Sequence, residues 1–169
     1  EAGQTGHYVL STIHTINSIE VITRLRKLGI SDYDIASTLA TAVSQRLVRK
    51  VCPKCAVKRE FTDEEKNKIN EYAKKYNMEF DFKDKYTWDA IGCKECNMTG
   101  YSGRIAIIEI LTLTDKIKEL VMNGKSTFDI RKAALEEGFL PFEMDGIKKV
   151  VDGKITLQEL NNKTLLFNS

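Results

Sequence analysis

The chain has 169 residues and a mass of 19.2 kDa, which is enough to bury a sizeable core in one or two domains. Hydrophobic residues make up 42% and charged residues 30%, a balance typical of a folded protein rather than a disordered one. With 26 Lys and Arg against 24 Asp and Glu, the net charge of +2 does not indicate a globally basic nucleic-acid binder. No apolar run approaches the roughly 20 residues of a membrane helix. Because Glu1 is preceded by neither an initiating Met nor a signal segment, we expect a piece of a longer cytosolic chain.

The first predicted element is a strand over residues 7–14, where apolar and β-branched side chains dominate. Asn17 or Ser18 then caps a predicted helix. A second helix is predicted to start at Ser31, with Asp34 at the capping-box spacing, and its apolar face consists of Ile35, Leu39, Val43 and Leu47. A strand followed by two helices is typical of the edge of an α/β unit.

The middle of the chain is bounded by two C-x-x-C pairs and contains one predicted helix. That helix runs from residue 63 to about 77 and is capped by Thr62. A strand over 105–111 follows the second cysteine pair. Residues 112–169 are predicted to be helical, with the N-cap candidates Thr114, Ser126 and Thr156.

The cysteine pairs indicate a metal site made of Cys52, Cys55, Cys93 and Cys96. Two residues between two thiolates let both sulfurs of one tight turn reach an ion at about 2.3 Å, and a second turn completes the tetrahedron that Zn²⁺ prefers. Such a closed site is structural, and it supplies folding free energy to a region with few aliphatic side chains. Residues 56–92 separate the pairs by more than the roughly 15–20 residues usual for a zinc ribbon, so we expect a helical insertion there.

Other interpretations of the four thiols remain open at this point. Disulfides are disfavoured by a cytosolic origin, and a thioredoxin-type redox pair would need the start of a βα unit, which neither pair has. Unmetallated thiols are a further alternative, and iron competes with zinc for four thiolates.

The two histidines, His7 and His14, flank the same predicted strand. Their parity differs, so their side chains point to opposite faces and do not share a metal. Each is explained by a local hydrogen bond at a strand end. The alternative is that His14 faces a ligand at the carboxyl edge of an α/β sheet and donates to a phosphate oxygen.

Several motifs in order along the chain resemble the secretion ATPase superfamily, the hexameric motor ATPases of type II secretion and type IV pilus assembly (the general secretion pathway protein E family). Residues 5–15 resemble the family's His box, and residues 22–25 and 45–49 continue it in register. The four cysteines followed by residues 99–104 resemble the tetracysteine element of the secretion and pilus-extension branch. Ile16 stands where the family usually has Asn, and Asn17 comes one position later.

This resemblance implies an α/β fold in three consecutive domains. Residues 1–50 would be the C-terminal part of a RecA-like P-loop ATPase core that carries the His box. Residues 51–106 would be a tetracysteine zinc-binding domain with a helical insertion, and residues 107–169 a C-terminal all-helical domain. In the nucleotide site, His14 would contact the γ-phosphate region and His7 would support it. Arg24 and Arg46 would be structural or inter-subunit residues near the nucleotide.

The same resemblance implies a cytoplasmic homo-hexamer that hydrolyses ATP with Mg²⁺ and powers pilus or pseudopilus assembly. It would associate peripherally with the bacterial inner membrane through the platform protein of the machine, with no nucleic acid as partner. The sequence contains no G-x-x-x-x-G-K-[ST] loop and no acidic strand to hold Mg²⁺, so this chain alone is predicted not to hydrolyse ATP.

Two alternative functions without enzymatic activity fit the residues. The first is a zinc-ribbon module that binds nucleic acid through a local basic run, which consists of Arg46, Arg49, Lys50, Lys54, Lys58 and Arg59. The second is a protein-docking module in which the metal-binding region and the terminal helices grip an assembly protein.

Overall fold

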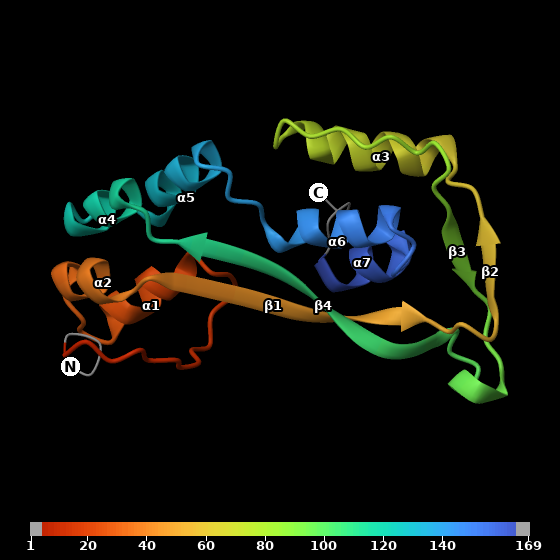
Figure 1. The fold of residues 1–169 in the computed structure, drawn as a ribbon, viewed down its shortest axis with the longest axis horizontal. Helices are drawn as coiled ribbons and strands as arrows, with labels where there is room; N and C mark the ends of the chain where they lie inside the picture. The colour runs from red at the N-terminus through yellow and green to blue at the C-terminus, as the bar shows by residue number, and fades with distance from the viewer. Residues whose placement is uncertain (1–4, 165–169) are drawn as a thin grey trace. The chain divides into compact units, whose positions relative to one another are not determined.

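The computed structural model describes residues 5–164 and confirms an α/β chain of helices and small sheets (Figure 1). Its elements in chain order are α1 (Glu20–Lys27), α2 (Asp32–Thr38), β1 (Thr41–Val51), β2 (Ala56–Arg59), α3 (Asp63–Lys74), β3 (Thr87–Ala90), the 3₁₀ turn η1 (Lys94–Cys96), β4 (Tyr101–Thr112), α4 (Asp115–Met122), α5 (Thr127–Glu136), α6 (Phe142–Val151) and α7 (Leu157–Thr164). None of the helices in residues 5–164 combines the length and apolarity needed to cross a bilayer.

The described residues pack into two units, each with its own apolar core. Unit 1 lies within Glu1–Ser44 and Glu109–Phe139, and unit 2 within Gln45–Ile108 and Leu140–Ser169. β1 and β4 pair with each other and contribute residues to both units. The boundaries expected at residues 50 and 106 from the resemblance stay a prediction.

Unit 1 is built from α1, α2, α4 and α5 around a core whose fully buried members include Ile22, Ile35, Ile117 and Ile130. The Arg26 side chain joins three of these helices. Its Nε lies 2.6 Å from Asp32 Oδ1, and its Nη1 and Nη2 donate to the carbonyl oxygens of Lys125 and Val121. One guanidinium thus links α1 to α2 and to two carbonyl groups at and just beyond the end of α4.

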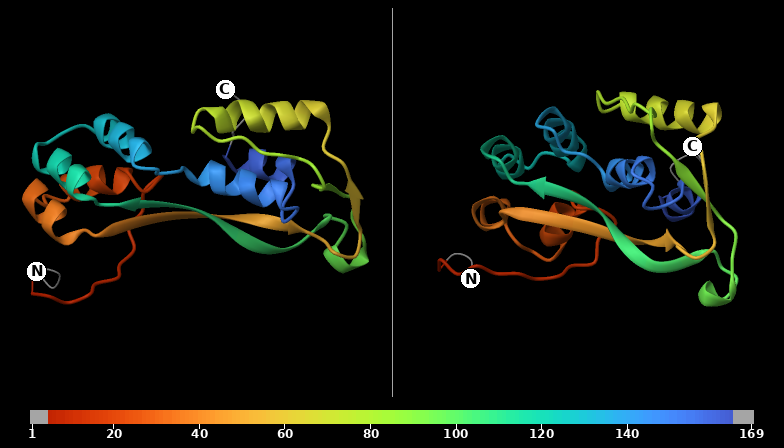
Figure 2. Two further views of the ribbon diagram at one scale, coloured as in Figure 1. Left: turned by 45° about the horizontal axis from the view of Figure 1, so that its top comes forward. Right: turned by 45° about the vertical axis from the view of Figure 1, so that its right-hand side comes forward.

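Unit 2 is built from β2, β3, α3, α6 and α7 around a second core, whose fully buried members include Ile69, Ile107, Met144, Ile147 and Leu160. β2 and β3 form an antiparallel pair in which Ala56 lies opposite Ala90 and Arg59 opposite Thr87. The further views in Figure 2 show this pair leading to α3. Arg59 fixes that approach, because it binds both carboxylate oxygens of Glu65 on α3 at 2.8 Å and Asp89 on β3 at 2.8 Å.

The predicted helix starts are confirmed by their side-chain caps. The hydroxyls of Ser31, Thr114 and Ser126 each accept a backbone N–H three residues later, and Thr62 forms a capping box with Glu65. Asn17 caps the start of α1, since its Oδ1 accepts the N–H groups of the two residues after Ser18 at 3.1 and 3.0 Å.

The predicted strand over residues 7–14 is wrong, because this segment has no strand structure. Both described sheets are two-stranded pairs, β1 with β4 and β2 with β3, so none of the described strands pairs with residues 7–14. Without that pairing Tyr8 and Leu10 are fully exposed, whereas Ile13 packs against the core of unit 1.

The second predicted helix is also wrong beyond Thr38, where α2 ends and β1 begins shortly after. Leu39, Val43 and Leu47 are spaced four residues apart, as on one face of a helix, but Val43 and Leu47 are exposed. The Thr and Val residues of this stretch favour a strand. Elsewhere the predictions differ from the structure mainly at boundaries: α3 ends at Lys74, and β4 begins at Tyr101. The helices predicted after residue 112 are present as α4 to α7, and residues 165–169 lie outside the described residues.

Candidate metal centre

The four cysteines lie on two turns that the strand pairing brings together. Cys52 directly follows β1 and Cys55 directly precedes β2, whereas Cys93 and Cys96 lie at η1, just after β3. Because β2 and β3 are paired in register, the two turns meet at one end of that pair. The Cys52 N–H donates to the Gly100 carbonyl at 2.9 Å, which joins the first turn to the start of β4.

The sulfur atoms have the spacing of a tetrahedral four-thiolate site. The Sγ–Sγ distances are 4.0 Å for Cys52 with Cys93, 3.8 Å for Cys55 with Cys96 and 3.8 Å for Cys93 with Cys96. All four sulfurs lie within 4.8 Å of one another. Metal–sulfur bonds of about 2.3 Å in a regular tetrahedron separate the sulfurs by about 3.8 Å. The four thiols can therefore hold one metal ion without a change of fold.

The same distances exclude a disulfide in this structure. A disulfide joins its sulfurs at about 2.05 Å, and all four cysteines are free. Cys52 and Cys96 are buried and Cys55 and Cys93 partly buried, so the cluster is largely shielded from solvent.

Backbone N–H groups surround one sulfur of the cluster. The amides of Cys93 and Gly100 both donate to Cys96 Sγ at 3.2 Å. Burial acts to raise the pKa of the Cys96 thiol, but these two amides and the neighbouring sulfurs outweigh it and lower the pKa to about 6. At Cys55, burial and the hydrogen bonds among the sulfurs raise the pKa to about 12. The surroundings of Cys96 thus favour its thiolate, the form in which a cysteine binds a metal.

Two glycines make the close approach of these turns possible. Gly100 has φ +77°, and a Cβ there would lie 2.8 Å from the carbonyl carbon and oxygen of Ala90. Gly92 has φ +109°, and a Cβ there would lie 2.6 Å from the Met98 oxygen. Side chains at these two positions would separate the cysteine turns, so the site depends on glycine at both.

The residues assigned to the nucleotide site by resemblance fall in different units. His7, His14 and Arg24 belong to unit 1 and are exposed. His7 Nδ1 lies 3.0 Å from the Thr5 hydroxyl, and Arg24 lies on α1. The two histidines do not flank a strand, and their role at a nucleotide stays a prediction.

Arg46 belongs to unit 2, where it lies on β1 and makes contacts with two helices. Its Nη1 donates to the Lys163 carbonyl at 3.0 Å, and its guanidinium carbon lies 4.2 Å from the centroid of the Phe142 ring. The side chain thus binds the last described turn of α7 and the first of α6. Its predicted place near a nucleotide stays untested.

The partners of two buried carboxylates could not be predicted from the sequence. Glu109 accepts both the N–H and the hydroxyl of Ser18, at 2.6 and 2.8 Å. Glu159, whose side chain is fully buried, accepts the backbone N–H of Arg49 at 2.9 Å and its Nε and Nη2 at 3.0 and 2.6 Å. The Arg49 guanidinium also lies 4.1 Å from the ring centroid of Tyr101. No local motif reveals these pairs, because their members are far apart in the sequence.

Comparison with known proteins places the chain among secretion and pilus proteins. The family model described as type II/IV secretion system protein matches residues 1–162. The chain is 33% identical over 172 residues to the type IV pilus assembly ATPase PilB of Myxococcus xanthus, which covers 97% of the chain and 28% of the relative. It is 34% identical to PilB of Thermus thermophilus, covering 98% of the chain and 18% of the relative. It is 33% identical to the type II secretion system protein HxcR of Pseudomonas aeruginosa, covering 95% and 29%.

These alignments run through both units and both cysteine turns, but the chain spans only 18–29% of the length of these three relatives. The match over nearly the whole chain agrees with the resemblance carried by the His box and the cysteine pairs. The chain belongs to the type II/IV secretion system protein family.

Proposed function

We propose that the chain is the C-terminal part of a cytoplasmic hexameric ATPase that powers type IV pilus assembly or type II secretion. The observation that carries this proposal is the alignment of 95–98% of the chain with relatives named as pilus assembly ATPases and as a type II secretion system protein. ATP and Mg²⁺ would bind mainly outside this chain. Residues 1–50 would then complete a RecA-like core, and residues 51–106 and 107–169 would be the metal-binding and helical domains.

The exposed N-terminal segment supports this assignment. Tyr8, Val9 and Leu10 are three consecutive large side chains that are all exposed, which is unusual in a folded protein. We propose that residues 7–14 contact the rest of the ATPase core in the full-length protein. His14 would then stand at the γ-phosphate with His7 behind it, and Arg24 and Arg46 would lie near the nucleotide at a subunit boundary.

We further propose that the four cysteines hold one structural Zn²⁺. The support is the sulfur spacing of 3.8–4.0 Å, the burial of two of the thiols and the N–H groups aimed at Cys96. When bound, the ion supplies the free energy that joins two turns lying far apart in the sequence. The residues themselves would hold the ion and exclude water, with no open position for catalysis.

Native mass spectrometry of the purified chain tests the metal proposal. We expect one zinc per chain, lost in the Cys52→Ser/Cys96→Ser variant, and a lower melting temperature after chelation. A folded, metal-free chain with an unchanged melting temperature would overturn the zinc proposal. Iron in place of zinc, identified by its mass and visible absorption, would overturn the identity of the metal and leave the ATPase proposal standing.

Steady-state ATP hydrolysis tests the enzymatic proposal. The 169-residue chain should show no turnover with Mg-ATP, whereas the full-length protein should hydrolyse ATP. In that protein, His14→Ala should lower kcat by about 100-fold if the imidazole stabilises charge on the γ-phosphate. Lys132→Gln, an exposed change in unit 1, serves as the matched control. Turnover by the isolated chain, or an unaffected His14→Ala enzyme, would contradict the assignment.

The nucleic-acid alternative is disfavoured by how the basic run is used. Arg46, Arg49 and Arg59 contact groups within unit 2 and so do not form a free phosphate track. Retention on a heparin column that falls steeply with salt would nevertheless support it. Docking to the membrane machine is compatible with the ATPase proposal, and a pull-down with the cytoplasmic domains of the inner-membrane platform protein tests it.

A further inference from the structure

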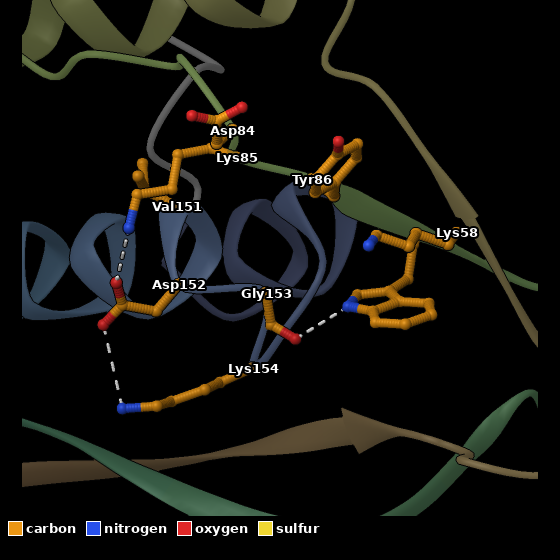
Figure 3. Close-up of a pocket in the computed structure, with 9 residues that line it drawn as sticks. Lys58, Asp84, Lys85, Tyr86, Val151, Asp152, Gly153 and Lys154 are labelled. Carbon is orange, nitrogen blue, oxygen red and sulfur yellow. Dashed lines mark hydrogen bonds and ion pairs between the residues drawn. The ribbon is translucent and has the colours of Figure 1, made fainter.

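Unit 2 carries a surface pocket of about 510 Å³ (Figure 3). Three segments form it: Lys58 on β2, residues 84–88 leading into β3, and residues 151–154 in the turn between α6 and α7. All of them belong to one unit, so the shape of the pocket is set within that unit.

A hydrogen bond joins two of the segments that form the pocket. Trp88 donates its indole N–H to the Gly153 carbonyl at 2.8 Å, which fastens the α6–α7 turn to β3. Gly153 has φ +68°, and a Cβ there would lie 3.1 Å from the indole nitrogen. A preformed concave surface loses little conformational entropy when a partner binds.

Three lysine ammonium groups line the pocket, those of Lys58, Lys85 and Lys154. Lys58 Nζ lies 3.8 Å from the centroid of the exposed Tyr86 ring. Lys85 and Lys154 share a single partner, Asp152, at 3.6 and 3.7 Å. These two distances are longer than the 2.6 Å of the Arg26–Asp32 and Arg49–Glu159 pairs and exceed ordinary hydrogen-bond length. An incoming carboxylate can therefore take over either lysine at little cost.

The charged residues that line the pocket indicate the class of ligand that it can bind. Asp84 and Asp152 line the same pocket as the lysines, so a run of phosphates would meet carboxylates as well as ammonium groups. A peptide chain offers both complements, because its Glu or Asp side chains pair with lysines while its backbone N–H groups donate to the aspartates.

We propose that this pocket docks an acidic, extended segment of a partner protein that carries a carboxylate at every second residue. The pocket is open to solvent, whereas sites for small molecules enclose most of the ligand surface. The side chains on an extended segment alternate between two faces, so every second residue can present a carboxylate to the lysines. This interaction does not depend on ATP binding or on the identity of the metal.

Isothermal titration of the 169-residue chain with a capped hexapeptide of alternating glutamate and tyrosine tests the proposal. We expect saturable binding with a dissociation constant on the order of 100 μM at low salt, weakening as salt is added. The Lys85→Gln/Lys154→Gln variant should bind about tenfold more weakly. Lys27→Gln/Lys132→Gln removes the same charge from exposed positions in unit 1 and should bind as the parent does.

A charge exchange separates recognition from misfolding. The Lys85→Glu/Lys154→Glu variant should lose the glutamate peptide and gain a peptide of alternating lysine and tyrosine, which an unfolded variant would not do. Zinc content and circular dichroism are measured for every variant. Equal binding by the pocket and control variants would overturn the proposal. So would saturable binding of inorganic pyrophosphate or heparin in place of the peptide, which would assign the pocket to phosphate-bearing ligands.

Discussion

At the scale of single residues, the Arg49–Glu159 pair determines how β1 meets α7. Glu159 is fully buried and accepts three hydrogen bonds from Arg49, one of them from its backbone. Arg49 lies over Tyr101, whose hydroxyl is 3.3 Å from the Thr156 hydroxyl. Because Arg49 lies three positions before Cys52, the same contacts fix the entry to the metal-binding turns.

We predict that Glu159→Gln lowers the free energy of unfolding by about 2 kcal/mol. Removing one partner of a fully buried pair costs about 3–5 kcal/mol, and the part of Arg49 that reaches solvent reduces this cost. Urea unfolding followed by circular dichroism measures the change. Glu71→Gln, on an exposed position of α3 in the same unit, should change stability by less than about 0.5 kcal/mol. Equal effects of the two substitutions would contradict the role given to Glu159.

The pH dependence of this pair provides a second prediction. Burial alone would raise the pKa of Glu159, but hydrogen bonds from the Arg49 side chain and backbone outweigh it and lower the pKa below its ordinary 4.5. The carboxylate therefore contributes stability above pH 4.5, and this contribution is lost as the pH falls through the lowered pKa. The stability difference between the parent and Glu159→Gln should shrink below pH 4.5. A difference that is constant with pH would show that ionisation of Glu159 is not involved.

At the scale of elements, the cysteine turns depend on backbone approach as much as on sulfur. Gly100 and Gly103 have similar positive φ angles of +77° and +73°, but only a Cβ at Gly100 would meet another backbone segment, at Ala90. Gly103 has open space around it. The two positions therefore separate the cost of the left-handed backbone from the cost of pushing the turns apart.

We predict that Gly103→Ala costs about 1–2 kcal/mol of stability, and that Gly100→Ala costs roughly 2 kcal/mol more because the backbone must move. Gly100→Ala should also weaken zinc binding at least tenfold, since the Gly100 N–H supports Cys96 Sγ and its carbonyl accepts from Cys52. Competition with a chromophoric chelator measures the affinity. An unchanged zinc affinity in Gly100→Ala would contradict this account of the site.

At the scale of the whole molecule, residues 5–164 form two apolar cores, and each has its own sensitive positions. Ile130 is fully buried in the core of unit 1 and Ile147 in that of unit 2. We predict that truncation of either to Ala costs about 3 kcal/mol. Hydrogen exchange should show lost protection mainly in α1, α2, α4 and α5 for Ile130→Ala, and mainly in α3, α6, α7 and the β2–β3 pair for Ile147→Ala. Uniform loss of protection in both variants would mean that the chain unfolds as one cooperative unit.

Much of this molecule follows from short-range sequence rules. The helix starts at Ser31, Thr62, Thr114 and Ser126 obey capping chemistry that acts over three residues. The cysteine cluster follows from two paired spacings, because tight turns fix the distance between two thiols whatever lies between the turns.

What could not be predicted depends on contacts between distant segments. Residues 7–14 have the composition of a strand, but composition does not supply a partner strand. Val43 and Leu47 fit a helix face by spacing, and only the pairing of β1 with β4 determines that they belong to a strand. The buried Glu109 and Glu159 look like surface acids until Ser18 and Arg49 are placed beside them. A single sequence carries no direct signal for such pairs.

The hydrogen bond from Trp88 to Gly153 has a practical consequence. Trp88 is the only tryptophan in the chain, and its indole lies between β3 and the α6–α7 turn. Its emission spectrum is therefore a built-in optical probe of unit 2, sensitive to the loss of that bond and to a guest in the adjacent pocket. Trp88 fluorescence does not report directly on unit 1. To follow the unfolding of unit 1, a second tryptophan has to be introduced there, for instance by Phe128→Trp on α5.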